Sequence, residues 1–202
     1  MKLIPLLLSL TSPPVFAGDN IDYQVGDVIM QSDPFESASG IKILTASKWN
    51  HVGVVVEKNG SLFVVEALAS VRYTPVDEYV NRGEDYKHLR LKEDLSMEDK
   101  TKINNAVKAY IGKRYDPILS WDDNKMYCSE LVQKVFKDAI DIEVTRERKI
   151  KAHIMVLVVP LLKSGIVTVP APFSEVAAEI DTNEIVVTPA DIMRSSNLEE
   201  VR

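Results

Sequence analysis

The residues HVGVVVEKNGSLFVVEAL, positions 51–68, decide the fold of this chain. Two runs rich in β-branched and apolar residues flank Asn59-Gly60. Asn-Gly between such runs is a strong hairpin signal, because a type I′ turn needs positive φ at both central positions. A two-residue loop also fixes the register, so that Lys58 faces Ser61 and the residues pair outward from there. The stretch therefore predicts two antiparallel strands in a defined register.

This register places a histidine beside a carboxylate. Counting outward, Gly53 lies opposite Glu66 and His51 lies opposite Leu68, and residues two apart on a strand share a face. His51 and Glu66 are then diagonal neighbours with Cβ atoms roughly 7–8 Å apart or less, a gap that long side chains close. We expect Gly53 to leave room for the imidazole. The alternatives are a histidine packed at a strand end and an exposed strand glutamate, but Glu66 interrupts an apolar stretch and needs a partner.

Cys128 is the only cysteine, within the motif MYCSELV at positions 126–132. Apolar residues recur at helical spacing after it, which predicts a helix over 128–139. The positive end of the helix dipole favours the reactive thiolate at such a position. The alternative is a small buried hydrophobic residue, which is where free cysteines usually lie. Together with His51 and Glu66, a reactive Cys128 would complete a Cys-His-acid triad.

The composition excludes several classes of protein. The chain has 202 residues, of which 46% are hydrophobic and 27% charged, as expected for one globular domain. Its net charge of −6 argues against a nucleic-acid partner, which requires clustered Lys and Arg. One cysteine and three separated histidines, His51, His88 and His153, offer no pair at ligand spacing. We expect neither a metal nor another cofactor.

The N-terminus has the features of a secretory signal peptide. Lys2 precedes a short apolar run, and Val15-Phe16-Ala17 offers small residues for cleavage. The alternative is a buried first helix or strand, which Pro5 and neighbouring prolines disfavour. We expect a signal peptide over 1–17, a single mature domain over 18–202, and a periplasmic or extracellular location. The run is too short to span a bilayer, and no cysteine follows it, which argues against a lipoprotein.

The remaining patterns predict an α+β fold in which a β-rich part precedes the cysteine helix. Ser96 and Asp99 form a capping pair before a helix that Gly112 ends. The apolar stretch 152–169 is predicted to be core or a partner surface. The elements expected besides the cysteine helix are strands at 26–30, 52–56, 62–65, 86–91 and 185–187, helices at 34–45 and 96–111, and a loop at 115–125.

Several short motifs occur in an order that is specific to one family. They are GDVI (26–29), SKWNHVGVV (47–55), VEA (65–67), YTP (73–75), GKRYD (112–116), YCSELV (127–132) and VTPADI (187–192). The chain resembles the permuted papain-like amidases of the YiiX and YaeF type, relatives of NlpC-type cell-wall peptidases and of lecithin-retinol acyltransferase. His51 precedes Cys128, as circular permutation of the papain order requires. The resemblance implies an antiparallel sheet or small barrel packed against helices, with the nucleophile at a helix N-terminus.

The resemblance also implies roles for individual residues. Cys128 would be the nucleophile, His51 the general base and acid, and Glu66 the residue that orients His51. The backbone N–H of Cys128 and a second donor would stabilise the oxyanion, and Tyr115 is the candidate for that donor. Tyr127 and Asp27 join Tyr115 in the predicted oxyanion or substrate-binding set. Alternatively, Tyr115 is a core aromatic residue and Asp27 bonds turn backbone near the site.

Three functions remain open at this stage. The first is an exported cysteine hydrolase that cleaves an amide bond in a small peptide, a cell-wall fragment or an N-acyl substrate through a thioester on Cys128. The second is a lipid-directed acyl hydrolase or acyltransferase, suggested by the apolar stretch 152–169. The third is a binding protein that uses the same pocket without chemistry. The sequence leaves the scissile bond, membrane contact and the oligomeric state undecided.

Overall fold

The computed structural model describes residues 22–32, 47–149, 181 and 183–201. The expected signal peptide, the expected helix at 34–45 and the apolar stretch 152–169 lie outside these residues.

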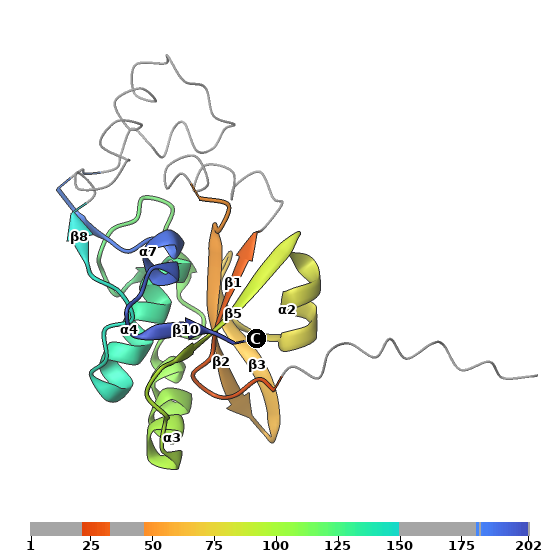
Figure 1. Ribbon diagram of the computed structural model, residues 1–202. Helices are drawn as coiled ribbons and strands as arrows, with labels where there is room; N and C mark the ends of the chain where they lie inside the picture. The colour runs from red at the N-terminus through yellow and green to blue at the C-terminus, as the bar shows by residue number, and fades with distance from the viewer. Residues whose placement is uncertain (1–21, 33–46, 150–180, 182, 202) are drawn as a thin grey trace, which may run out of the picture.

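In the described part of the chain, six strands form one antiparallel sheet with helices on both faces (Figure 1). The strand order is β10-β5-β1-β2-β3-β4. Helix α2 covers one face, and α3 and α4 pack against the other. The strands of the sheet are β1 (Val28–Ser32), β2 (His51–Lys58), β3 (Ser61–Ala67), β4 (Val71–Pro75), β5 (Asp85–Leu91) and β10 (Leu198–Glu200). The helices are α2 (Val76–Arg82), α3 (Met97–Ala106), the 3₁₀ turn η1 (Val107–Ala109), α4 (Cys128–Ile140) and α7 (Pro189–Met193).

The hairpin has the predicted register. Asn59 and Gly60 have φ angles of 55° and 77°, as a turn with two positive φ values requires. Lys58 pairs with Ser61, and the ladder runs to Gly53 opposite Glu66. On its other side β2 pairs with β1. The strand that begins at His51 therefore lies in the middle of the sheet, where both neighbours fix it.

Helix α4 places the cysteine against the sheet. Cys128 is its first residue, as predicted, and the helix ends at Asp141, which has the left-handed φ of 56°. Leu131, Val135 and other apolar side chains of one helix face are fully buried in the same core cluster as the inward residues of β1, β2 and β3. Burying each such side chain contributes about 1.5–3 kcal/mol. Apolar packing on the sheet thus fixes the position of the helix.

Several elements differ from the prediction. β4 and α2 were not predicted, and α2 has only seven residues and no side-chain cap at its start. The predicted 96–111 helix divides into α3 and η1, although the Ser96–Asp99 capping box forms as expected. The predicted 115–125 loop contains parts of two short parallel strands, β6 (Arg114–Tyr115) and β7 (Lys125–Met126). A further short pair joins β8 (Arg148–Lys149) to β9 (Ile185–Val186). Elements this short leave little periodicity in the sequence.

Gly53 is required for a different reason from the one predicted. A Cβ atom there would overlap the Val64 side chain and would lie 2.9 Å from the Val65 carbonyl oxygen. The neighbouring strand β3 therefore takes the space that a side chain at position 53 would need. The glycine lets two central strands approach closely.

We expect Gly53→Ala to lower the free energy of unfolding by about 1–3 kcal/mol, because the Val65 backbone cannot move away from the added methyl group. Urea denaturation followed by circular dichroism measures this. The matched control is Ser61→Ala in the exposed end of the same hairpin, which should change stability by less than about 0.5 kcal/mol. Equal effects of the two substitutions would contradict the close-packing explanation.

Candidate active site

The N-terminus of α4 is held by its neighbours in a way that fixes the thiol. The Tyr127 hydroxyl accepts a hydrogen bond from the Val187 N–H at 3.2 Å, and the Ser129 hydroxyl donates to the Val187 carbonyl at 2.7 Å. Glu130 accepts from the Tyr127 N–H at 3.3 Å. Cys128 itself is a free thiol and is 1% exposed. Residues on both sides of the cysteine are thus anchored, and the thiol is left unbonded to another sulfur.

His51 connects this thiol to Glu66. Its Nε2 lies 2.7 Å from Glu66 Oε2, so the diagonal contact predicted from the hairpin register forms. The Cys128 side chain lies close enough to this ring to influence its protonation. Burial alone would lower the pKa of His51, but the hydrogen bonds and negative charges of Cys128 and Glu66 raise it to about 9. The imidazole therefore favours the protonated form at neutral pH.

Glu66 is a fully buried carboxylate whose oxygens are saturated with donors. Oε1 accepts from the Thr74 hydroxyl at 2.6 Å and from Arg82 Nη1 at 2.9 Å. Oε2 accepts from Arg82 Nη2 at 2.5 Å in addition to its contact with His51. Arg72 approaches Oε1 at 3.3–3.4 Å. Burial acts to raise the pKa of Glu66, but these donors hold it well below its usual range.

Sequence reasoning missed the three residues that bind Glu66. Arg72 lies directly opposite Glu66 on β4, and Thr74 lies diagonal to it on the same strand. The alternating pattern of residues 71–75 was the available signal, because recognising a third strand there would have placed both side chains beside the carboxylate. Arg82 comes from the end of the unpredicted helix α2, and no local pattern links it to Glu66.

Tyr115 is brought to the thiol, as the sequence analysis expected. It is the second residue of β6 and pairs with Met126, two residues before Cys128. Burial, the nearby Cys128 and Asp116 all raise the pKa of Tyr115 far above its ordinary value. The hydroxyl therefore keeps its proton across the physiological range and is able to donate it in a hydrogen bond.

Tyr127 and Asp27 have other surroundings. The Tyr127 hydroxyl is engaged with Val187, and the ring lies edge-on to Trp121 at 6.5 Å. Asp27 is not at this site, contrary to the prediction. It precedes the Val28 end of β1, whereas His51 is opposite Gln31 at the other end.

The Asp27 carboxylate belongs to a separate buried cluster. It binds His88 Nε2 at 2.6 Å, Arg90 at 2.7 and 2.9 Å, and the Gln24 backbone N–H at 2.7 Å. These contacts join β1 to β5 and to the turn before β1. The turn-bonding role that was the alternative for Asp27 is therefore the one that the contacts show.

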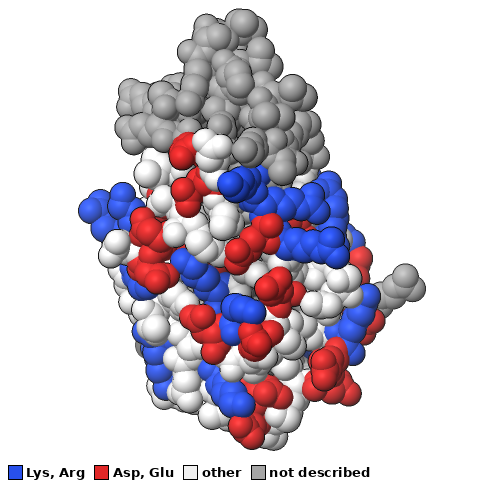
Figure 2. Space-filling view, turned by 90° about the vertical axis from the view of Figure 1, so that its left-hand side faces the viewer, with Lys and Arg blue, Asp and Glu red and all other residues white. Residues whose placement is uncertain are grey.

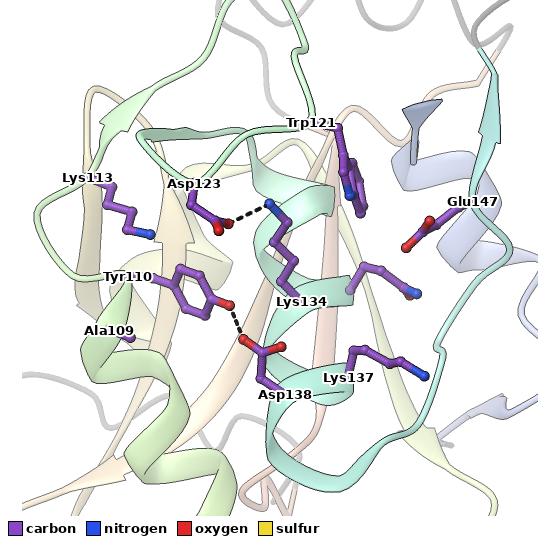
Figure 3. Close-up of a pocket in the computed structure, with 10 residues that line it drawn as sticks. Ala109, Tyr110, Lys113, Trp121, Asp123, Lys134, Lys137, Asp138 and Glu147 are labelled. Carbon is purple, nitrogen blue, oxygen red and sulfur yellow. Dashed lines mark hydrogen bonds and ion pairs between the residues drawn. The ribbon is translucent and has the colours of Figure 1, made fainter. Parts of the chain in front are cut away.

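A polar cavity of about 520 Å³ lies along the outer face of α4, and Cys128, His51 and Glu66 are not among its lining residues. Figure 3 shows two polar pairs in its lining: Lys134 lies 2.9 Å from Asp123, and the Tyr110 hydroxyl donates to Asp138. Figure 2 shows basic and acidic side chains intermixed over this side of the molecule. The chemically reactive groups therefore lie elsewhere, at the start of α4.

Comparison with known proteins identifies the family. A family model described as "Permuted papain-like amidase enzyme, YaeF/YiiX, C92 family" matches residues 22–202. The chain belongs to the permuted papain-like amidases. This confirms the resemblance and the fold class drawn from the sequence. In this family's arrangement His51 precedes Cys128 in the chain, and the structure accordingly carries the histidine on an early strand and the cysteine on a later helix.

The chain is similar to two YiiX proteins of Escherichia coli. The uncharacterized protein YiiX of Escherichia coli K12 is 36% identical over 154 residues, which are 75% of each chain. A solved structure, described as the metalloprotein YiiX from Escherichia coli O157:H7, is 29% identical and superimposes with a TM-score of 0.76. The alignment with it covers 89% of this chain and 96% of that one. Within the described ranges of the present chain, no helix is long and apolar enough to cross a bilayer.

The raised pKa of His51 gives a measurable titration. We expect the His51 ring protons to titrate near pH 9 in NMR spectra, with the resonance assigned by its loss in His51→Ala. A raised folded-state pKa means that this group's stabilising contribution is complete below about pH 6.5 and is lost as pH rises through about 9.

The matched variant is Glu66→Gln, which removes one of the charges that favour the imidazolium and should move the titration to lower pH. A wild-type midpoint at or below about 6.5 would contradict the proposed charge state of His51.

Proposed function

We propose that this protein is a cysteine hydrolase that cleaves an amide bond through a thioester on Cys128. The observation that carries the proposal is the juxtaposition of a thiol, an imidazole and a buried carboxylate: His51 is hydrogen-bonded to Glu66 and lies beside Cys128. This is the arrangement of an activated nucleophile with a base that a third group orients. Membership of an amidase family supports the choice of bond.

The chemistry follows from the positions of these groups. The His51 imidazolium holds the Cys128 thiolate as an ion pair, and the thiolate attacks the substrate carbonyl carbon to form a carbon–sulfur bond and an oxyanion. We assign the stabilisation of that oxyanion to the backbone N–H of Cys128, at the positive end of the α4 dipole, and to the Tyr115 hydroxyl. As the carbon–nitrogen bond breaks, His51 gives its proton to the leaving amine. It then accepts a proton from water, which hydrolyses the thioester and regenerates the thiol.

The proposed substrates are a small peptide, a cell-wall fragment or an N-acyl compound. The proposed location is periplasmic or extracellular, with residues 1–17 removed and 18–202 forming the mature enzyme. An export signal fits the N-terminal pattern of one charge, an apolar run and small residues. A lone cysteine has no intrachain disulfide partner in an oxidising compartment, which suits its use as a nucleophile. The net charge of −6 argues against a nucleic-acid substrate.

A second candidate is a lipid-directed acyl hydrolase or acyltransferase with the same triad. The apolar sequence at 152–169 favours it, because an apolar wall suits an acyl chain. In this version the thioester carries a fatty acyl group, and water or another nucleophile accepts it. A binding protein without chemistry is the third candidate, and the intact triad argues against it.

The solved YiiX structure described as a metalloprotein raises the question of a metal here. Among the described residues, no group of three or more His, Cys, Asp or Glu side chains is placed to hold a metal ion. The Glu66 oxygens accept from Arg82 and Thr74, and cationic and hydroxyl donors at a carboxylate compete with a cation. The described residues therefore do not fit a metal, and the proposed chemistry uses the thiol.

The decisive test is turnover by Cys128→Ala. We expect this variant to lose hydrolysis of N-acyl amide and peptide libraries, scored by mass spectrometry of the products, while its circular dichroism spectrum and melting temperature stay close to those of the wild type. Intact-mass analysis of the wild type should show an acyl adduct on Cys128. Retained turnover in Cys128→Ala would contradict the proposal.

The same experiment separates the alternatives. An adduct with the mass of a fatty acyl chain after exposure to lipid extracts favours the lipid-directed enzyme. Tight ligand binding that Cys128→Ser leaves unchanged, with neither product nor adduct from the wild type, favours the binding protein.

A further inference from the structure

Two buried clusters of the same composition lie on one face of the sheet. Each contains a carboxylate, a histidine and an arginine: Glu66 with His51 and Arg82, and Asp27 with His88 and Arg90. Ile29 and Gln31 of β1, and Asp27 just before the strand, alternate onto the face that α2 covers, so both clusters share it. They stand at opposite ends of β1. Only the Glu66 cluster reaches a thiol.

Arg82 is the strongest partner of Glu66 after His51. It binds both carboxylate oxygens, at 2.9 and 2.5 Å, which is the bidentate geometry in which a guanidinium is most effective. Its side chain is 16% exposed, whereas that of Arg72 is 47% exposed and contacts only Oε1. A largely buried, bidentate pair is screened far less by solvent than a half-exposed one.

The surroundings of Arg82 hold it in place. Nη2 donates to Gln31 Oε1 at 3.3 Å, and the guanidinium lies 5.2 Å from the Tyr79 ring centroid. The Gln31 amide in turn donates to the Tyr79 carbonyl. Gly83 follows directly, and a Cβ there would lie 2.8 Å from Gln31 Cδ and Nε2. The end of α2 is therefore packed closely on β1, and Arg82 is held between Glu66, Gln31 and the Tyr79 ring.

The charges of these groups alternate along the series. A Cys128 thiolate, a His51 imidazolium, the Glu66 carboxylate and the Arg82 guanidinium sum to zero. Without Arg82 these groups carry one net negative charge at a site where Cys128 and Glu66 are almost fully buried, and the half-exposed Arg72 is the remaining arginine on Glu66. An uncompensated buried charge is costly, and Cys128 is the group that removes it by taking up a proton.

We propose that Arg82 is a positioning residue of this site: by neutralising Glu66, it leaves the positive charge of His51 available to hold Cys128 as a thiolate. The inference rests on the proposed thiol chemistry. Arg82 touches neither the thiol nor a substrate carbonyl and acts through Glu66 and His51. Its removal is expected to change the protonation of the nucleophile more than the fold.

The test is the rate of Cys128 alkylation by iodoacetamide from pH 5 to 9, which needs no substrate. We expect Arg82→Met to slow labelling about tenfold at pH 6.5 and to shift the midpoint of the pH profile by about one unit upward. Arg82→Lys should recover part of the loss, because it keeps the charge but not the bidentate contact. Arg72→Met should have a smaller effect than Arg82→Met.

Arg90→Met is the matched control. Arg90 is 27% exposed and holds Asp27 in the same bidentate manner, but at the other end of β1. We expect its alkylation profile to stay within about twofold of the wild type. The other titratable groups near the thiol are Tyr115, Tyr127, Asp116 and Glu130, and they are unchanged in every variant. Burial raises the pKa of Glu130 to about 7, against the opposing effect of Lys134.

The outcomes separate this inference from the proposed function. Rapid wild-type labelling that persists unchanged in Arg82→Met overturns the role of Arg82 alone. Slow wild-type labelling with a midpoint near an ordinary thiol value of about 8.5 overturns the thiol chemistry and this inference together. An equal shift in Arg90→Met also overturns the inference, because it would show a general effect of loosening the sheet. If Arg82→Met does not fold, slower labelling of Arg82→Gln than of Arg82→Lys supports the inference, and equal rates overturn it.

Discussion

The rest of the site depends on the burial of one carboxylate. Glu66 has no exposed surface, and a carboxylate removed from water is tolerated only when its oxygens are bonded and its charge is balanced. β2 supplies His51, β4 supplies Thr74 and Arg72, and α2 supplies Arg82. Four consecutive elements of the chain thus converge on one side chain. The same contacts hold Glu66 against Nε2 of His51 and so orient the imidazole. One network therefore stabilises the buried carboxylate and positions the histidine.

The parts of this arrangement that the sequence predicted are those set by local rules. The Asn59-Gly60 turn defines a register, and the register alone brings His51 and Glu66 together. The helix start at Cys128 follows from apolar spacing in the same way. Arg82 was missed because its contact depends on where α2 folds back on the sheet, and a short uncapped helix leaves no periodic signal. Asp27 was misplaced because a motif shows which residues recur together but not at which end of a strand they lie.

The contrast between the two carboxylate–histidine pairs shows what distinguishes a site from a structural cluster. Asp27 with His88 and Glu66 with His51 have similar distances and burial, and each has an arginine. The difference lies in the position of α4, whose apolar face is committed to the core formed by β1, β2 and β3. That packing directs the helix N-terminus, and with it the thiol, to the His51 end of the sheet. The packing of α4 on one face of the sheet therefore determines which carboxylate–histidine pair of the other face, Glu66 with His51, lies next to the thiol.

The position of the histidine at the start of its strand suits this order of groups. Two residues further along β2, the neighbouring strand β3 approaches Gly53 so closely that a methyl group does not fit there. At the strand start the His51 ring bonds Glu66, and Cys128 lies beside it. Glu66 lies opposite Gly53, two residues along β2 from His51, and Arg82 binds both of its oxygens. Burial of this pair keeps the local dielectric low, which strengthens each charge interaction. The proposed position of a substrate carbonyl is therefore the Cys128 end, where Tyr115 is the proposed hydrogen-bond donor.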